Sequence, residues 1–300
     1  MGNDVGLSDS SPSLEGHANT NPKARTRVEP APFLKWAGGK TQLFDEIRKR
    51  LPQRFGGAYV EPFLGGGAVF FALVRDGSVS RARLFDRNEE LVATYCAVRD
   101  DVDGVIAALA RHHNVEEHYY EVRALDVEKL SPAERAARMI FLNRVGYNGL
   151  YRVNASGRFN VPFGRYRNPR ICDDVGLRSA SRALSCASIE VADFEQACAG
   201  VVAGDVVYLD PPYLPLSRTS NFTAYAEGRF GEAEHRRLAE VFGRLIDVGA
   251  TALLSNSDTP LGRELYASFK THFVEATRAI NSKGDKRGVV SEMLVQGIRV

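Results

Sequence analysis

Short apolar runs recur in two separated parts of the chain. A parallel strand is buried on both faces, so it reads as a continuous apolar run rather than as an alternation. Such runs, with some shorter β-like stretches, predict strands at 59–61, 83–86, 188–191, 206–209 and 252–256, and alternation predicts a last strand at 289–300. Amphipathic stretches typical of helices follow several of them. The pattern predicts an α/β fold with a mainly parallel sheet.

The strand and helix rhythm is interrupted between about residues 89 and 185. Helices are expected there at 103–110, 116–125 and 131–141, the last opened by a capping box with proline at its first position. Residues 154–157 read as the turn of a β-hairpin. The interruption therefore predicts an inserted helical and β-hairpin domain.

This reading divides the chain into three parts. Residues 1–30 are rich in Ser, Asn, Gly, Asp and Pro and are expected to form a disordered tail. Residues 31–88 and 186–300 would form one sheet-containing domain, and residues 89–185 the insertion. No internal repeat is found.

Composition narrows the class of protein only slightly. The 300 residues are 44% hydrophobic and 25% charged, with a net charge of +2, so any basic surface must be local. The four cysteines are widely spaced and form no C-x-x-C, which indicates reduced thiols and a cytoplasmic location. No apolar run has membrane-spanning length, and His112, His113 and His118 form no H-E-x-x-H, so neither a membrane nor a metal is expected and a solvated helix end is the favoured reading of the histidines.

The tetrapeptide Asp210-Pro211-Pro212-Tyr213 ends the strongly apolar run 206–209. The prolines cannot donate to a sheet ladder, so the strand must stop there and leave Asp210 at its carboxyl end, where α/β sheets bind ligands. A carboxylate, a carbonyl without its own N–H and an aromatic face suit the exocyclic amino group of a planar base. A plain proline turn is the alternative for an isolated motif of this kind.

A glycine-rich turn follows the predicted strand 59–61. Gly65 and Gly67 lie between that strand and a helix expected at 68–75, as in the first βα unit of a nucleoside-binding sheet. Asp86 ends the next strand about 20 residues later, the spacing of a carboxylate that holds ribose hydroxyls. The alternative role for Asp86 is a helix N-cap.

Gly39-Lys40-Thr41 invites a phosphate-binding-loop interpretation. The motif needs a glycine five positions before Gly39, where Leu34 stands, so we reject a nucleoside triphosphatase. Lys40 can still reach a carboxylate.

Arginines and aromatic residues are interleaved between residues 144 and 170. The arginines are Arg144, Arg152, Arg158, Arg165, Arg167 and Arg170, and no acidic residue occurs before Asp173. Basic groups combined with stacking rings indicate a nucleic-acid surface, and a β-hairpin can enter the major groove. An exposed hairpin kept for solubility would explain the charges but not the rings.

Taken together, these motifs resemble the Dam-like DNA adenine-N6 methyltransferases. The resemblance covers residues 32–300 and rests on F-L-K-W-A-G-G-K, E-P-F-L-G-G-G, N-G-L-Y-R-V-N, F-N-V-P-F-G-R-Y, D-P-P-Y, N-F-T-A-Y and N-S-K-G-D-K-R-G. It implies a Rossmann-like methyltransferase sheet that binds S-adenosylmethionine, with residues 89–185 as the target-recognition domain for double-stranded DNA. The hairpin looks like those of GATC-specific members.

The resemblance also implies roles for individual residues. Cofactor-contacting positions are matched by Trp36, Lys40, Phe63, Gly65, Gly67, Asp86, Asp193, Phe194 and Asp210. DNA-contacting positions are matched by Lys35, Tyr147, Asn148, Leu150, Arg152, Pro162 and Arg165. Catalysis is expected at Asp210, Pro211, Pro212 and Tyr213, acting on an adenine flipped out of the duplex.

Three alternatives remain at this point. Cytosine-N4 methylation uses similar amino-group chemistry. A DNA-binding regulator or inactive remnant would keep the fold without turnover, although Asp210, Lys40 and Asp86 are all present. A protein-glutamine methyltransferase would usually carry asparagine at Asp210 and would not need the basic hairpin. The sequence leaves open the oligomeric state and whether the enzyme is chromosomal, part of a restriction system or from a phage.

Overall fold

The structure is a computed structural model that describes residues 1–2, 28–36, 38–214, 230–277 and 289–300. The expected tail at 1–30, the motifs N-F-T-A-Y and N-S-K-G-D-K-R-G, and Ala37 lie wholly or largely outside these residues. Within them, no helix is long and apolar enough to cross a membrane.

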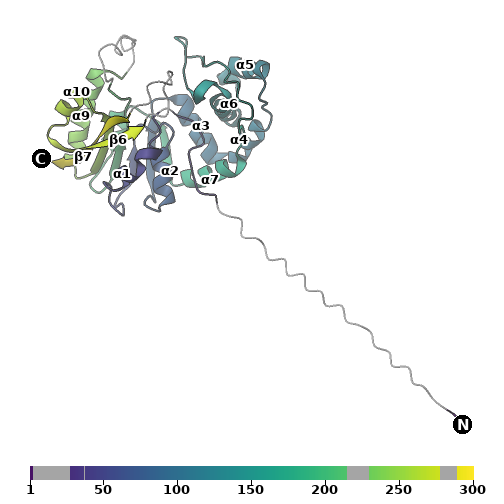
Figure 1. Ribbon diagram of the computed structural model, residues 1–300, viewed down its shortest axis with the longest axis horizontal. Coiled ribbons are helices and arrows are strands. Elements are labelled where there is room, and N and C mark those ends of the chain that lie inside the picture. Colours follow the sequence, from purple (N-terminus) through teal and green to yellow (C-terminus); the bar gives the residue numbers. More distant parts are fainter. Residues whose placement is uncertain (3–27, 37, 215–229, 278–288) are drawn as a thin grey trace.

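A seven-stranded sheet forms the centre of the described residues (Figure 1). The strands are β1 (Tyr59–Glu61), β2 (Ala82–Asp86), β3 (Ala187–Val191), β4 (Val206–Leu209), β5 (Thr251–Ser257), β6 (Phe269–Thr277) and β7 (Val289–Arg299). Their order is β3-β2-β1-β4-β5-β7-β6, and the first five are parallel whereas β7 is antiparallel to both neighbours. The predicted α/β fold with a mainly parallel sheet is confirmed.

Alternate residues of the strands enter separate cores on the two faces of the sheet. Tyr59 on β1 and Tyr208 on β4 belong to one cluster of buried side chains, whereas Val60 and Val207 belong to the other. This two-sided burial explains why these strands read as continuous apolar runs.

Helices cover the sheet and build the insertion. They are α1 (Phe44–Arg48), α2 (Ala68–Arg75), α3 (Glu89–Asp100), α4 (Val102–Leu109), α5 (Glu116–Ala124), α6 (Pro132–Val145), α7 (Asp174–Leu184), α8 (Phe194–Ala199), α9 (Glu232–Asp247) and α10 (Pro260–Leu265), with short 3-10 turns at Thr41–Leu43, Val127–Lys129 and Tyr147–Gly149. In Figure 1, α4, α5 and α6 form a lobe at the opposite end of the molecule from β6 and β7. Helix α3 contacts β2, β3 and α6, so it joins the sheet to that lobe.

Several elements match their sequence signals closely. Helix α6 begins after Ser131 with the expected capping box and Pro132 in its first turn. Four elements were not predicted: helices α3, α7 and α8 and strand β6. Strand β6 pairs only with β7 among the described strands, and its alternating polar residues suit an edge strand rather than a buried run.

Candidate active site

The carboxyl ends of β1 and β4 meet at the centre of the sheet. The chain runs outward from β1 through β2 to β3, then returns to place β4 against the other side of β1. Ligands bind to α/β sheets at this kind of reversal in strand order. The glycine turn follows β1 and Asp210 follows β4, so the fold brings the two principal sequence motifs together.

Donors from neighbouring elements hold both oxygens of the Asp210 carboxylate. Lys40 Nζ lies 2.9 Å from Oδ2. The Ser255 hydroxyl donates to Oδ1 over 2.9 Å. Ser255 has a single hydroxyl proton, so the Tyr208 hydroxyl, 2.9 Å from the Ser255 oxygen, must donate to it in turn. Asp210 is therefore fixed in place by an ion pair and a short chain of hydroxyl groups.

These contacts also govern the charge on Asp210. Burial raises the pKa of this carboxyl, Lys40 and the Ser255 hydroxyl oppose the rise, and the Glu292 carboxylate adds to it. Both donors thus favour the anion, the form in which every oxygen lone pair is available to accept hydrogen bonds.

The Tyr213 ring is anchored at its far end. Its hydroxyl donates to Glu292 Oε2 on β7 over 2.7 Å. Burial, followed by the nearby carboxylates, raises the pKa of Tyr213 well above its usual value, so the hydroxyl keeps its proton. Just beyond it, the Leu214 N–H donates to Asn256 Oδ1 over 3.0 Å. The half-buried ring therefore has a fixed orientation, with Lys40 Nζ 4.6 Å from its centre.

The glycine turn is shaped by Trp36. Gly65 and Gly67 adopt left-handed φ values of 48° and 66°, which favour glycine. A Cβ on Gly65 would lie 2.9 Å from Trp36 Cδ1, and one on Gly66 would lie 3.0 Å from Trp36 Cβ. A side chain on Gly65 would collide with the indole, and one on Gly66 would crowd Trp36 Cβ, so the turn and Trp36 form one closely packed unit.

Asp86 ties the glycine turn to the end of β2. Its Oδ2 accepts from the Gly65 N–H over 3.0 Å, and its Oδ1 accepts from the Asn88 N–H over 2.9 Å. The N-cap of α3 is Asn88, which accepts from the Leu91 N–H, so the helix-cap alternative for Asp86 is wrong. Burial raises the pKa of Asp86, and the backbone N–H groups oppose that rise. Asp86 lies where a carboxylate could bind a ligand held in the turn.

Asp193 and Phe194 are engaged within the protein. Asp193 is the N-cap of α8, and both of its oxygens accept from Arg237 Nη2, at 2.8 and 2.7 Å. Phe194 is buried and stacks on Phe63 with their ring centres 5.7 Å apart. Phe63 is only half-buried, so it is the more accessible ring of this pair.

The predicted hairpin is confirmed as a short one. Val153 and Phe159 form an isolated antiparallel bridge, as do Gly146 and Phe163. Of the predicted DNA-contacting residues, Leu150 is half-buried, and the exposed ones are Lys35, Tyr147, Asn148, Arg152, Pro162 and Arg165. Arg152 lies along the hairpin, where it donates to Asn160 Oδ1 over 2.7 Å. The hairpin thus presents polar and aromatic groups to solvent.

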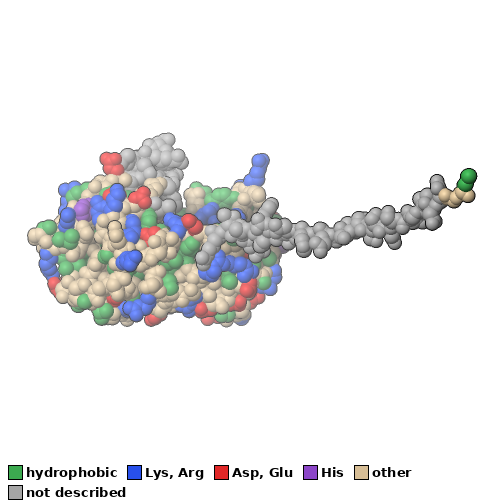
Figure 2. Space-filling model, turned by 90° about the horizontal axis from the view of Figure 1, so that it is seen from below, with side chains coloured by type: hydrophobic (Ala, Val, Ile, Leu, Met, Phe, Trp, Pro, Cys, Tyr) green, Lys and Arg blue, Asp and Glu red, His purple; other side chains and the backbone are tan. Residues whose placement is uncertain are grey.

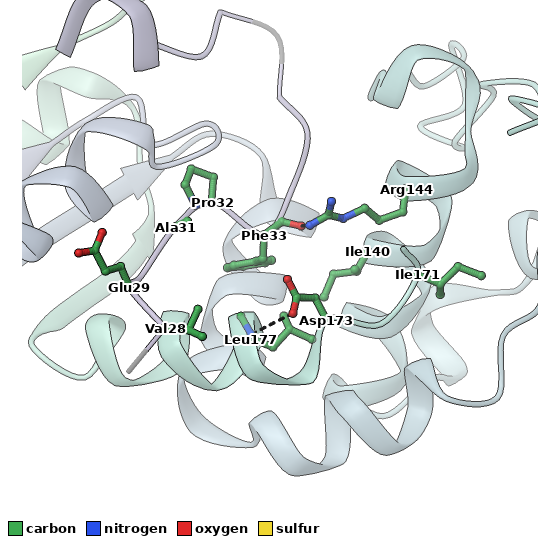
Figure 3. Close-up of a pocket in the computed structure, with 11 residues that line it drawn as sticks. Val28, Glu29, Ala31, Pro32, Phe33, Ile140, Arg144, Ile171, Asp173 and Leu177 are labelled. Atoms are coloured by element: carbon green, nitrogen blue, oxygen red, sulfur yellow. Dashed lines mark hydrogen bonds between the residues drawn. The ribbon is translucent and has the colours of Figure 1, made fainter. Parts of the chain in front are cut away.

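Two of the six arginines between residues 144 and 170 bind groups of the protein itself. Arg144 turns away from the hairpin and donates to the Phe33 carbonyl over 2.8 Å (Figure 3). Arg170 pairs with Asp173 at 3.2 Å. The pocket in Figure 3, between residues 28–33, α6 and α7, contains none of the predicted site residues. Basic and acidic side chains are interspersed on the face drawn in Figure 2, in keeping with the small net charge.

Two of the three histidines of the insertion, His112 and His118, pack against Phe141, whereas His113 is exposed as expected. His112 is half-buried and stacks on Phe141 with ring centres 4.6 Å apart, and its Nδ1 lies 3.1 Å from His118 Nε2. Burial, with the charge of His118, lowers the pKa of His112 to about 4. Among the residues with described positions, no cluster of three His, Cys, Asp or Glu could hold a metal ion.

Sequence reasoning missed several residues around the site. Ser255 and Asn256 lie near the carboxyl end of β5, and the pairing of Leu209 with Leu254 brings this part of the strand beside Asp210. Polar residues ending a buried run were a usable signal for both. Glu292, on the antiparallel strand β7, gave no comparable signal in the sequence.

A second missed acid lies at the end of β1. Glu61 is buried and accepts from the Tyr59 hydroxyl over 2.9 Å. Burial raises its pKa well above the usual value, and the charges of Asp210 and Asp86 contribute in the same direction. The rise in pKa favours a neutral carboxyl group next to the two acids of the site.

Comparison with known proteins identifies the family. The model of the D12 class N6 adenine-specific DNA methyltransferases matches residues 36–280. The chain belongs to this family. The DNA adenine methylase of Escherichia coli K12 is 40% identical over 266 residues, which cover 87% of this chain and 93% of that protein.

Two further relatives are named type II methyltransferases. M1.LlaDCHI of Lactococcus lactis subsp. cremoris is 41% identical over 279 residues, covering 90% of this chain and 96% of the relative. M.MjaIII of Methanocaldococcus jannaschii is 42% identical over 278 residues, covering 87% and 96%. This D12-class chain is thus an adenine-specific DNA methyltransferase with a Rossmann-like fold. This result rejects cytosine-N4 methylation, protein-glutamine methylation and a DNA-binding protein without turnover.

Proposed function

We propose that the protein transfers a methyl group from S-adenosylmethionine to N6 of an adenine flipped out of duplex DNA, within the sequence GATC. The observation that carries this proposal is the Asp210 carboxylate, held by Lys40 and Ser255 at the end of β4 beside the half-buried Tyr213 ring. The DNA substrate agrees with the cytoplasmic location expected from the cysteines.

The residues present fit the proposed cofactor. Gly65 and Gly67 lie at the reversal of strand order, where their backbone can approach a nucleoside closely. Asp86 would hold the ribose hydroxyls, and Trp36 would close the turn from the side of the insertion. Phe63, supported by Phe194 and Asp193, would contact the adenine ring of the cofactor. When bound, S-adenosylmethionine supplies an electrophilic methyl group on its sulfonium.

Asp210 would activate the target amino group by accepting hydrogen bonds. The lone pair of adenine N6 is delocalised into the ring, which makes the nitrogen a poor nucleophile. A carboxylate has about four acceptor sites, so Asp210 retains free ones while bound to Lys40 and Ser255. Together with the Pro211 carbonyl, it would localise the lone pair and direct it at the methyl group. Positioning and fixed charge then supply the rate enhancement.

Tyr213 and Pro212 would complete the base pocket. An amino group inside a duplex is out of reach of a buried methyl donor, so the adenine must leave the stack. The Tyr213 ring would stack on the flipped base, because its bond to Glu292 already sets its orientation. Pro212 is exposed beyond the end of β4 and offers no competing N–H donor.

The insertion at residues 89–185 would recognise the target sequence. Tyr147, Asn148, Arg152 and Arg165 are exposed on its hairpin, and Lys35 and Pro162 are exposed beside them. The hairpin resembles those of GATC-specific members, which supports GATC as the site. Leu150 is half-buried and would support the exposed hairpin residues that contact DNA.

Sequencing of methylated DNA tests the whole proposal. The purified protein is incubated with S-adenosylmethionine and unmethylated genomic DNA, and modified bases are then mapped on single molecules. We expect N6-methyladenine at GATC on both strands. Methylation at another motif would overturn the proposed site but keep the chemistry, whereas N4-methylcytosine or no product would overturn the proposed reaction.

A further inference from the structure

Asn143, near the end of α6, bridges two segments that meet between the sheet and the insertion. The residue is 1% exposed, and its side-chain Oδ1 accepts from the Lys35 N–H over 2.7 Å. Its Nδ2 donates to the carbonyl of Lys35 over 2.7 Å and to that of Gly149 over 2.9 Å. Both amide protons and the amide oxygen are therefore used, and the side chain pairs with the Lys35 backbone as a neighbouring strand would.

The side chain of Lys35 lies against the same part of the insertion. Gly149 has a φ of +63°, and a Cβ there would lie 2.6 Å from Lys35 Cδ. Lys35 Nζ lies 4.6 Å from the centre of the Tyr166 ring. The backbone and the side chain of Lys35 are thus both placed by residues of the insertion.

The next residue, Trp36, contacts the glycine turn on the sheet side. Its indole fills the space that a side chain on Gly65 would need, and it stacks on Tyr151 of the hairpin with ring centres 5.5 Å apart. The dipeptide Lys35-Trp36 therefore touches the cofactor turn through Trp36 and the DNA hairpin through both residues. A shift of this dipeptide changes both surfaces at once.

We propose that Asn143 is a positioning residue. It couples the binding of the cofactor at the glycine turn to the affinity of the hairpin for DNA. This inference rests on the proposed function, because it takes the glycine turn as the cofactor site and the hairpin as the DNA site. Two ligands that order the same dipeptide bind more tightly together than apart, and the effect of each on the other is equal. The buried Asn143 amide transmits this ordering. A shift of Lys35 away from Gly149 would leave an N–H of this amide without a hydrogen-bond acceptor.

The test measures the coupling directly in a four-state binding cycle. The Kd of a fluorescent duplex carrying the methylated site is measured by anisotropy with and without saturating S-adenosylhomocysteine. The Kd of S-adenosylhomocysteine is measured with and without duplex from the fluorescence of Trp36, the only tryptophan of the chain. The ratio of the two Kd values for each ligand gives the coupling factor twice, and the two estimates must agree.

Asn143→Asp is the central variant, because aspartate keeps the shape and the acceptor but loses both donations. Asn154→Asp is the matched control: it adds the same charge to the same domain, while Asn154 Oδ1 only accepts, from the N–H groups of Ser156 and Arg158, which aspartate can still do. Gly149→Ala disturbs the contact between Lys35 and the insertion from the side of Gly149. It tests the coupling if Asn143→Asp does not fold.

We expect a coupling factor of about fivefold or more in the wild type and in Asn154→Asp, falling below about twofold in Asn143→Asp and Gly149→Ala. An unchanged factor in a folded Asn143→Asp protein, or in Gly149→Ala when that variant alone folds, overturns the proposal. A wild-type factor of one does so as well. Failure of the wild type to bind duplex or S-adenosylhomocysteine at all would instead overturn the proposed function.

Discussion

Lys40 and Asp210 form an ion pair of 2.9 Å at the centre of the site, with only 6% and 19% of their side chains exposed. The two residues are far apart in the sequence and come from the segment before α1 and the end of β4. Removal of one partner of a buried pair leaves an uncompensated charge, which is strongly unfavourable. Lys40, expected at the cofactor, therefore also maintains the charge of the proposed catalytic carboxylate.

The first prediction concerns Asp210 itself. Asp210→Ala should lower kcat for methyl transfer by at least about 100-fold, because it removes the charge that localises the N6 lone pair. Tritiated methyl transfer to a GATC duplex measures the effect, with circular dichroism as the check on folding. Asp247→Ala, at the exposed end of α9, is the matched control and should retain activity. A folded Asp210→Ala enzyme of near wild-type rate would remove the proposed catalytic centre.

The second prediction concerns pH. Asp210 must be ionised to accept hydrogen bonds from the amino group, so kcat/KM should fall as the pH drops through its pKa, which burial raises. Ser255→Ala removes a donor that favours the anion, so the acid limb should move to higher pH. Ser257→Ala is the control, because the Ser257 hydroxyl is buried and has no hydrogen-bond partner among the described residues. Identical acid limbs in wild type and Ser255→Ala would show that Ser255 does not act through Asp210.

The third prediction concerns the cofactor. Asp86→Ala should weaken S-adenosylmethionine binding by about 1.5–3 kcal/mol, the scale of a lost hydrogen bond to a charged group. Calorimetric titration measures the change. Asp86→Asn keeps an acceptor for one backbone N–H but removes the charge. Its affinity for S-adenosylmethionine should therefore lie between those of the wild type and Asp86→Ala. Equal affinity in wild type and Asp86→Ala would leave Asp86 with only its observed bonds to Gly65 and Asn88.

The fourth prediction concerns sequence recognition. If Arg152 reads a guanine with both of its terminal nitrogens, Arg152→Ala should lose about 1–3 kcal/mol of discrimination at one base pair. Values of kcat/KM on GATC and on each single-base variant measure this. Arg152→Lys keeps the charge but loses the planar fork, so it should also lose discrimination while keeping the salt dependence. A uniform loss on all duplexes would assign Arg152 to phosphate contact instead.

Much of the fold follows from local signals in the sequence. Val206–Leu209 was predictable as a strand because burial on both faces requires a continuous apolar run. Helix α6 was predictable from its capping box, which depends on residues only three positions apart. Strand β6 escaped prediction because an edge strand needs no such run and is defined by its partner β7.

The sequence alone determined that an acid would end β4, that a glycine turn would follow β1, and that a hairpin rich in arginine would interrupt the sheet, because each depends on neighbouring residues. Only the tertiary structure decided what these features contact. Strand order and register bring Ser255 to Asp210, and chain packing brings Asn143 to Lys35. Such contacts join residues more than 40 positions apart, and no local pattern encodes that distance.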